Sequence, residues 1–147
     1  MRKNFHISGF TLVELMITIA IIAILMAIVV PNYQLQINKS RRADAKTTLM
    51  GESQRLERCF TDTDTYLGCE TTDYVTAIPS YKGYYTVTTK QAAGNTITAT
   101  TYTLAATFLA DGPQASDTKC KTFTLNHLGE KTAVDSSGTD TTADCWN

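Results

Sequence analysis

The stretch GFTLVELMITIAIIAIL, from Gly9 to Leu25, decides the fold of this chain of 147 residues. The apolar run continues to Val30, and residues 10–30 contain one charged side chain, Glu14. A helix of this length measures about 31 Å at ~1.5 Å per residue, which matches the hydrocarbon core of a bilayer. The stretch therefore predicts a helix that can span a membrane.

The free energy of insertion supports this prediction. Thirteen residues of the run are Leu, Ile, Val or Phe, and each favours insertion by about 0.3–0.6 kcal/mol. Their sum of about 4–8 kcal/mol exceeds the ~3 kcal/mol that one carboxylate costs within the membrane. The alternative, a buried helix of a soluble core, is weaker because such helices are usually shorter and amphipathic.

The residues before the run have an unusual order. An ordinary secretory signal has a charged start, then an apolar segment, then the cleavage site. Here the charged segment MRKNFHISG, residues 1–9, ends in the small Gly9, and the apolar segment follows it. Cleavage after Gly9 would remove a charged leader on the cytoplasmic side and keep the helix.

These residues resemble the class III signal peptide of the type IV pilin family. The resemblance covers the apolar tract to Pro31 and five positions at its start: Gly9, Phe10, Thr11, Leu12 and Glu14. It implies that a prepilin peptidase cleaves between Gly9 and Phe10 and N-methylates the new Phe10 amine. It also implies that Glu14 directs assembly with other pilin subunits through the inner-membrane pilus machinery.

Glu14 has a physical reason to act in assembly. An intramembrane carboxylate needs a partner, and the apolar run contains none. After cleavage, the Phe10 amine would be a cation one helical turn away, on the same subunit or on a neighbour. Pairing between subunits would set their register; the alternative is that Glu14 only lies at the headgroup boundary, near the positive end of the helix dipole.

The orientation of the span involves a conflict. Arg2 and Lys3 precede it, but four cations follow it: Lys39, Arg41, Arg42 and Lys46. A count of Lys and Arg alone would place the wrong end in the cytoplasm. The leader and the cysteines favour the opposite orientation. With that orientation, the resemblance implies a single-pass inner-membrane protein that later becomes part of an extracellular pilus on the bacterial surface.

Pro31 is expected to kink the helix, since proline removes a backbone hydrogen bond. We expect the helix to resume and run to about Phe60, with an apolar stripe at helical spacing that packs on a sheet. The stripe consists of Ala45, Leu49, Leu56 and Phe60.

The rest of the chain predicts β-structure. Segments 83–90, 100–109, 121–126 and 131–134 are rich in β-formers or alternate, with turns at 92–95 and 127–130. The predicted class is α+β, the type IV pilin fold, in which a long N-terminal helix packs on a three- or four-stranded antiparallel sheet. The expected parts are a leader (1–9), a transmembrane and assembly helix (10–31) and a head (32–147). The head divides into a helical half (32–60), a connecting loop (61–82), the sheet (83–134) and a disulfide-bounded C-terminal loop (120–145).

The four cysteines favour disulfides, because their number is even and the head is exported. Three pairings are possible, and we favour Cys59–Cys69 and Cys120–Cys145, each contributing about 3 kcal/mol in a loop-closure account. No CxxC pair is present and His127 is the only histidine after cleavage, so the pattern predicts no metal site.

Three surface features have a functional and a structural interpretation. Acidic residues between 135 and 144 could bind calcium, but their spacing is irregular and favours a surface loop: Asp135, Asp140 and Asp144. Six basic residues could capture DNA, but the net charge is −1 and no aromatic residues are interleaved, so a solvated face or neighbour contacts are favoured: Lys39, Arg41, Arg42, Lys46, Arg55 and Arg58. Four tyrosines could form an adhesive surface but are interpreted as strand and core residues: Tyr81, Tyr84, Tyr85 and Tyr102.

The C-terminal segment resembles one group within this family more than the others. Residues 120–146, CKTFTLNHLGEKTAVDSSGTDTTADCW, resemble the ending of PilE-type minor pilins. This implies a structural subunit of a type IV pilus that acts in assembly or priming, twitching motility and adhesion. A major pilin, a DNA-uptake or adhesive pilin and a type II secretion pseudopilin remain alternatives. The chain lacks a Ser/His/Asp or Cys/His set and a glycine-rich phosphate loop, so no enzyme and no cofactor are predicted.

Overall fold

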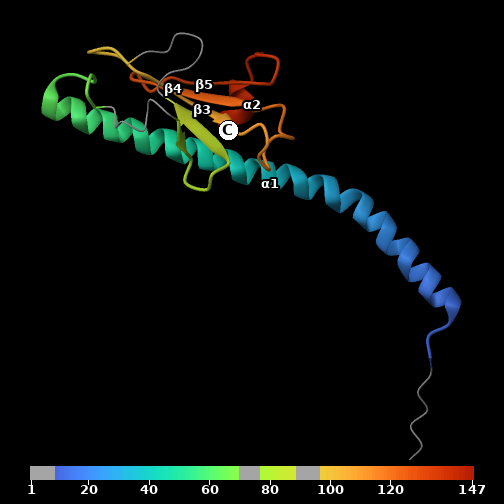
Figure 1. Ribbon diagram of the computed structural model, residues 1–147. Helices are drawn as coiled ribbons and strands as arrows, with labels where there is room; N and C mark the ends of the chain where they lie inside the picture. The colour runs from blue at the N-terminus through green and yellow to red at the C-terminus, as the bar shows by residue number, and fades with distance from the viewer. Residues whose placement is uncertain (1–8, 70–76, 89–96) are drawn as a thin grey trace, which may run out of the picture. The chain divides into compact units, whose positions relative to one another are not determined.

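The computed structural model describes residues 9–69, 77–88 and 97–147 (Figure 1). One long helix, α1 (Leu12–Thr63), begins two residues after Phe10. The chain divides into two compact units, Met1–Ile37 and Asn38–Asn147, and α1 contributes to both.

In the first unit, α1 presents apolar side chains on all sides. Every large apolar residue between Phe10 and Val30 is at least 51% exposed. Such a surface is stable only against lipid or against other apolar helices. Among the described residues this is the one helix that is long and apolar enough to cross a membrane. Helix α1 continues through Pro31, and the kink expected there stays a prediction.

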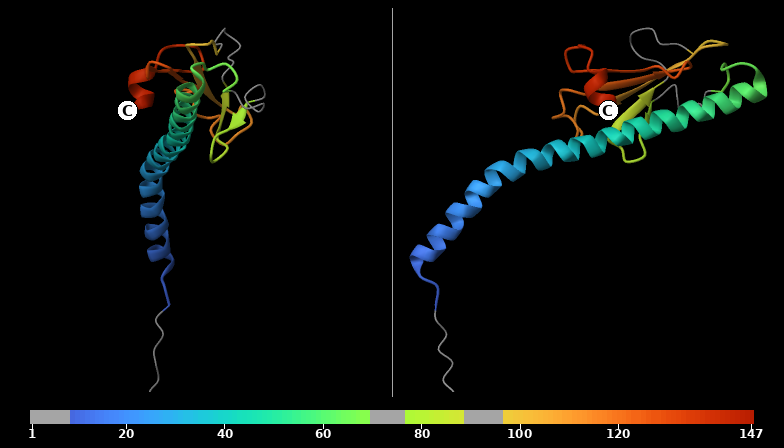
Figure 2. Two further views of the ribbon diagram at one scale, coloured as in Figure 1. Left: turned by 90° about the vertical axis from the view of Figure 1, so that its left-hand side faces the viewer. Right: turned by 180° about the vertical axis from the view of Figure 1, so that it is seen from behind.

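The second unit contains a five-stranded antiparallel sheet beside the second half of α1 (Figure 2). The strands follow the chain in the order β1-β2-β3-β4-β5. They are β1 (Ile78–Pro79), β2 (Tyr85–Thr88), β3 (Thr103–Phe108), β4 (Thr122–Asn126) and β5 (Lys131–Val134), and a short helix, α2 (Thr142–Trp146), follows. The α+β class and the antiparallel order are confirmed.

The predicted number of strands, three or four, is too low by at least one. The additional strand is β1, which pairs Ile78 with Val87 and Pro79 with Thr86, inside the segment for which the sequence predicts a loop. Two residues with a proline do not give a strand pattern, so only pairing with β2 makes this segment a strand. The predicted strand at 131–134 has the observed bounds. The predicted turn at 92–95 lies outside the described residues.

The core lies between α1 and one face of the sheet. Three of the four predicted helix positions, Ala45, Leu49 and Leu56, are fully buried, and Phe60 is partly buried. From the sheet, the fully buried side chains include Tyr85, Val87, Leu104, Ala106 and Phe123. Each large apolar side chain buried in this way contributes about 1.5–3 kcal/mol, which holds the sheet on the helix.

Polar side chains of α1 also hold the loops of the head. Arg42 forms two hydrogen bonds to the Asp117 carboxylate, at 2.6 and 2.7 Å, and both side chains are nearly buried. Asp44 is 5% exposed, and its carboxylate accepts hydrogen bonds from the Ser80 hydroxyl and the Lys82 amide. These contacts fix the loop before β4 and the turn between β1 and β2 against the helix.

A second polar cluster holds the far end of α1. The Glu57 carboxylate accepts hydrogen bonds from the phenols of Tyr66, at 3.0 Å, and Tyr102, at 2.9 Å. Burial, followed by the hydrogen bond to Glu57, raises the pKa of Tyr66 to about 12. Burial also raises the pKa of Tyr102. Both phenols therefore stay protonated and donate at physiological pH, so the cluster joins α1, the following loop and the residue that precedes β3.

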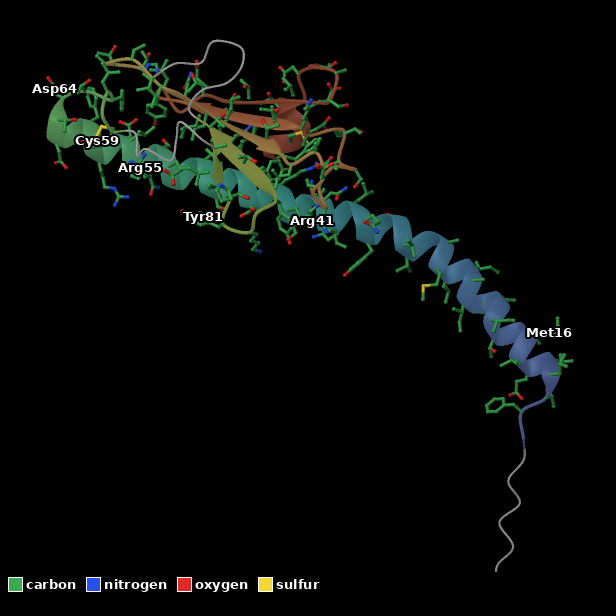
Figure 3. The ribbon with its side chains drawn as sticks, in the orientation of Figure 1. Met16, Arg41, Arg55, Cys59, Asp64 and Tyr81 are labelled. Atoms are coloured by element: carbon green, nitrogen blue, oxygen red, sulfur yellow. A yellow bond between two sulfur atoms is a disulfide. The ribbon has the colours of Figure 1, made fainter. Side chains whose placement is uncertain are left out.

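Replacing Gly51 by alanine should stabilise the head. Gly51 lies within α1, and a Cβ atom there would lie 2.8 Å from the Tyr81 hydroxyl. Tyr81, which Figure 3 labels, lies in the turn between β1 and β2. Tyr81 is 73% exposed, so its ring can move aside. Alanine favours helix over glycine by about 0.8–1.0 kcal/mol. Urea unfolding should therefore show Gly51→Ala more stable by about 0.5–1 kcal/mol; a less stable variant would show that the Tyr81 ring cannot move.

Candidate assembly and processing site

The start of α1 brings together the residues that the sequence singled out at the N-terminus. Gly9 and Phe10 precede the helix, and Phe10 is 83% exposed. The backbone N–H of Leu15 donates to the Thr11 carbonyl at 3.2 Å, which is the first helical hydrogen bond here. The Glu14 N–H donates instead to the Thr11 hydroxyl at 3.3 Å. Thr11 is therefore the N-cap of α1.

Glu14 lies in the first turn of α1, three residues after the cap. Threonine followed by glutamate at this spacing is a capping-box sequence, in which the glutamate can also reach back to the cap. The carboxylate is thus within one turn of Phe10 and near the positive end of the helix dipole. If the chain were cleaved after Gly9, this end would hold one cation and one carboxylate in an apolar surrounding.

Most of the six basic residues bind other parts of the head. Arg41 donates to the Pro113 carbonyl at 2.5 Å, and its guanidinium lies 5.3 Å from the centre of the Tyr84 ring. Arg55 bonds the Glu52 carboxylate and the Cys69 carbonyl, and Arg58 bonds the Gln54 carbonyl. These contacts support the structural interpretation of the basic run.

Besides Tyr84, a second aromatic residue, Trp146, lies against basic side chains in the folded head. The Trp146 ring has the Lys46 and Lys131 ammonium groups at 5.8 and 5.4 Å from its centre. Lys46 also lines a cleft of about 260 Å³ with Lys39, Arg42 and residues 143–145 and 147. Burial, and then repulsion by Arg42 and Lys131, lower the pKa of Lys46. No sequence pattern indicates this cluster, since Trp146 lies a hundred residues from Lys46.

The structure pairs the cysteines as favoured. The Sγ atoms of Cys59 and Cys69 are 1.97 Å apart, and those of Cys120 and Cys145 are 1.95 Å apart. The first bond joins the end of α1 to the following loop. The second bond joins the loop just before β4 to α2. Within α2, Trp146 Nε1 also donates to the Thr132 carbonyl at 2.8 Å.

The acidic side chains of residues 135–144 are held by hydrogen bonds within this loop and by one ion pair to Lys119. One Asp135 oxygen accepts hydrogen bonds from the Ser137 hydroxyl and from the amides of Ser137 and Thr139, which lowers the Asp135 pKa. Asp140 accepts from the Thr142 hydroxyl, and Asp144 pairs with Lys119. Within the part of the chain that the structure describes, no group of three or more His, Cys, Asp or Glu residues could hold a metal ion.

The four tyrosines separate into two kinds. Tyr85 and Tyr102 are fully buried and belong to the core, as interpreted from the sequence. Tyr84 is half-buried under Arg41, whereas Tyr81 is exposed at the turn between β1 and β2.

Two family models match this chain. Residues 5–30 match the prokaryotic N-terminal methylation motif. Residues 31–124 match the model described as type IV minor pilin ComP, DNA uptake sequence receptor. The second match contains most of the described head but ends within β4, before β5, α2 and Trp146.

Known proteins with similar sequences include a major pilin, a fimbrial protein and a protein named for its dependence on prepilin peptidase. The chain is 42% identical over 65 residues to the type IV major pilin protein PilA of Myxococcus xanthus, covering 44% of this chain and 30% of PilA. It is 34% identical over 94 residues to prepilin peptidase-dependent protein D of Escherichia coli, covering 57% of this chain and 64% of that protein. It is 42% identical over 76 residues to fimbrial protein Q of Moraxella bovis, covering 44% of this chain and 48% of that protein. The chain therefore spans less than two thirds of the length of each of these relatives.

The fold is similar to that of a solved minor pilin. The crystal structure of the non-core minor pilin PilV of Neisseria meningitidis aligns with a TM-score of 0.50 and 23% identity. The alignment covers 68% of this chain and 89% of PilV.

Proposed function

We propose that this chain, which belongs to the family of type IV minor pilins, is a structural subunit of a pilus that acts in pilus assembly or priming, twitching motility and adhesion. The methylation motif and the apolar first half of α1 fit a membrane-anchored pilin that becomes part of a surface pilus. Pilins are structural proteins, and we propose no catalytic role.

The proposal rests on one observation above all: the apolar side chains of α1 from Leu12 to Val30 are exposed, with Glu14 as the single carboxylate among them. In the precursor, lipid would cover this surface; in the pilus, the corresponding helices of other subunits would cover it. Prepilin peptidase would cleave at Gly9–Phe10 and methylate the Phe10 amine. The name of the similar Escherichia coli protein, which refers to the same peptidase, supports this step.

Purified pili test the proposal. Pili sheared from cells that produce the native chain should contain it with Phe10 as the first residue, in much lower amount than the major subunit. Mass spectrometry identifies the first residue and measures the amount. A chain that keeps residues 1–9 and never appears in the pilus fraction would contradict the proposal, and an abundance equal to the major subunit would identify a major pilin.

The same sample tests the disulfides of an exported head. Peptide mapping without reduction should recover Cys59 linked to Cys69, and Cys120 linked to Cys145. Peptides that link Cys59 to either of the last two cysteines would contradict this pairing.

A second candidate function is DNA capture. The family description names a DNA uptake sequence receptor, and the cluster of Lys46, Lys131 and Trp146 combines cations with an aromatic ring, as nucleic-acid sites do. The Lys46 ammonium donates to the Asn147 carbonyl oxygen at 3.4 Å. No Asp or Glu side chain among the described residues forms an ion pair with either lysine, so neither charge is neutralised by such a side chain.

Duplex DNA binding by the full chain in detergent tests this candidate. Lys46→Gln with Lys131→Gln should weaken binding and lower the slope of log affinity against log salt by about one for each phosphate that the variant no longer neutralises. Lys82→Gln removes an exposed cation from another part of the head and serves as the control. Equal binding by the double variant and the control would exclude this cluster as the DNA site.

A further inference from the structure

The N-cap of α1 lies two residues from the bond that is proposed to be cleaved. The first three N–H groups of the helix, on Leu12, Val13 and Glu14, precede its first helical hydrogen bond, from Leu15 to Thr11. Such groups have no acceptor inside the helix. The Thr11 hydroxyl supplies one for Glu14, and the helix begins at Leu12. Gly9 and Phe10 are consequently outside the helix.

If the Thr11 hydroxyl were absent, the backbone N–H groups of Val13 and Glu14 could instead donate to carbonyls that precede the helix. A helix that extended by two residues would direct the Glu14 N–H to the Phe10 carbonyl and the Val13 N–H to the Gly9 carbonyl, each four residues back. Unsatisfied donors are costly where lipid excludes water, so an uncapped helix near the membrane would favour this extension. The Gly9 carbonyl belongs to the Gly9–Phe10 bond and would then be held in a helical hydrogen bond.

We propose that Thr11 is a positioning residue for cleavage: its hydroxyl starts the helix at Leu12 and keeps the Gly9–Phe10 peptide outside it. This inference rests on the proposed processing at that bond. Hydrolysis adds water at the Gly9 carbonyl carbon, breaks the bond to the Phe10 nitrogen, and leaves a Gly9 carboxylate and a Phe10 ammonium. The peptidase must reach that carbon and stabilise the oxygen as it gains charge, which requires a carbonyl free of helical bonding.

The test compares three variants of the full precursor, inserted in lipid nanodiscs, as substrates of prepilin peptidase. Thr11→Val keeps the shape of the side chain and removes the acceptor, whereas Thr11→Ser keeps the acceptor. Thr18→Val is the matched control, since the Thr18 hydroxyl donates to the Leu15 carbonyl at 2.8 Å inside the same helix and caps nothing. Mass spectrometry follows cleavage, and carbon chemical shifts of labelled Gly9 and Phe10 report the helix start.

Thr11→Val should lower kcat/KM about fivefold, the factor that corresponds to ~1 kcal/mol for a lost N-cap. Its Gly9 and Phe10 shifts should move toward helical values, while Thr11→Ser and Thr18→Val behave as the native precursor does. If the native precursor is cleaved and Thr11→Val is cleaved at the same rate, the role of Thr11 is excluded. Equal slowing of Thr11→Val and Thr18→Val would also exclude it. A native precursor that is not cut at Gly9–Phe10 would instead overturn the proposed processing.

Discussion

Glu14→Ala is expected to insert into the membrane as the native chain does and to be at least tenfold depleted from purified pili. Removing the carboxylate removes its insertion cost of about 3 kcal/mol, so anchoring should not suffer. Assembly should suffer, because the proposed partner of Glu14 is the Phe10 amine of a neighbouring subunit. Two unit charges about 4 Å apart attract by on the order of 4 kcal/mol in a partly polar protein surrounding.

Membrane fractionation and the pilin content of sheared pili measure the two halves of this expectation. Glu14→Gln keeps the shape of the side chain and the N-cap of α1, but it removes the negative charge. The variant therefore distinguishes an effect of the charge from an effect of the capping box. If Glu14→Gln assembles normally while Glu14→Ala does not, the carboxylate charge is not what directs assembly. Normal assembly of both variants would contradict the assembly role and would support the alternative, that Glu14 only lies at the headgroup boundary.

Asp117→Ala should lower the free energy of unfolding of the head by about 3 kcal/mol or more, because a broken buried ion pair leaves an uncompensated charge. The Asp117 and Arg42 side chains are only 3% and 11% exposed. The change also removes the acceptor of the Gln114 amide, at 2.6 Å. Thermal unfolding should show a midpoint lower by more than about 10 °C.

An exposed ion pair of the same head provides the control. Lys119 and Asp144 lie 3.0 Å apart, with side chains 54% and 61% exposed. Lys119→Ala should cost less than about 1 kcal/mol, since water and salt screen such pairs. The double variant Arg42→Met, Asp117→Leu should recover much of the stability by replacing the pair with apolar contacts. Equal losses for Asp117→Ala and Lys119→Ala would contradict a buried role for Asp117.

The Arg42–Asp117 pair also bears on the orientation conflict. Four cations follow the span in the sequence, and their number argues for the wrong topology. In the folded head, Asp117 neutralises Arg42, and Arg41 is held by a carbonyl and an aromatic ring. Lys39 and Lys46 pair with no Asp or Glu side chain among the described residues, although Lys46 donates to the Asn147 carbonyl oxygen at 3.4 Å. The cations that count against an external head are therefore partly structural, which a linear count cannot register.

The protection of the two edge strands, β1 and β5, is a second feature that residue spacing does not predict. Along one edge, Pro79 in β1 lacks a backbone donor. Along the other, Thr141 donates to the Ala133 carbonyl at 2.9 Å, and Trp146 donates to the Thr132 carbonyl. The C-terminal segment thus covers β5, and both edges are protected from pairing with other chains. The sequence predicted β5 but not what lies against it.

The sequence by itself determined every feature that depends on neighbours along the chain. These are the apolar run, the position of Glu14, the apolar stripe of α1 and four of the five strands, since hydrophobic periodicity and β-propensity act over a few residues. Only the tertiary structure decided β1, the Arg42–Asp117 pair and the Lys46–Trp146–Lys131 cluster. Their partners are up to a hundred residues apart, and such contacts depend on how α1 and the sheet pack, which no local pattern records.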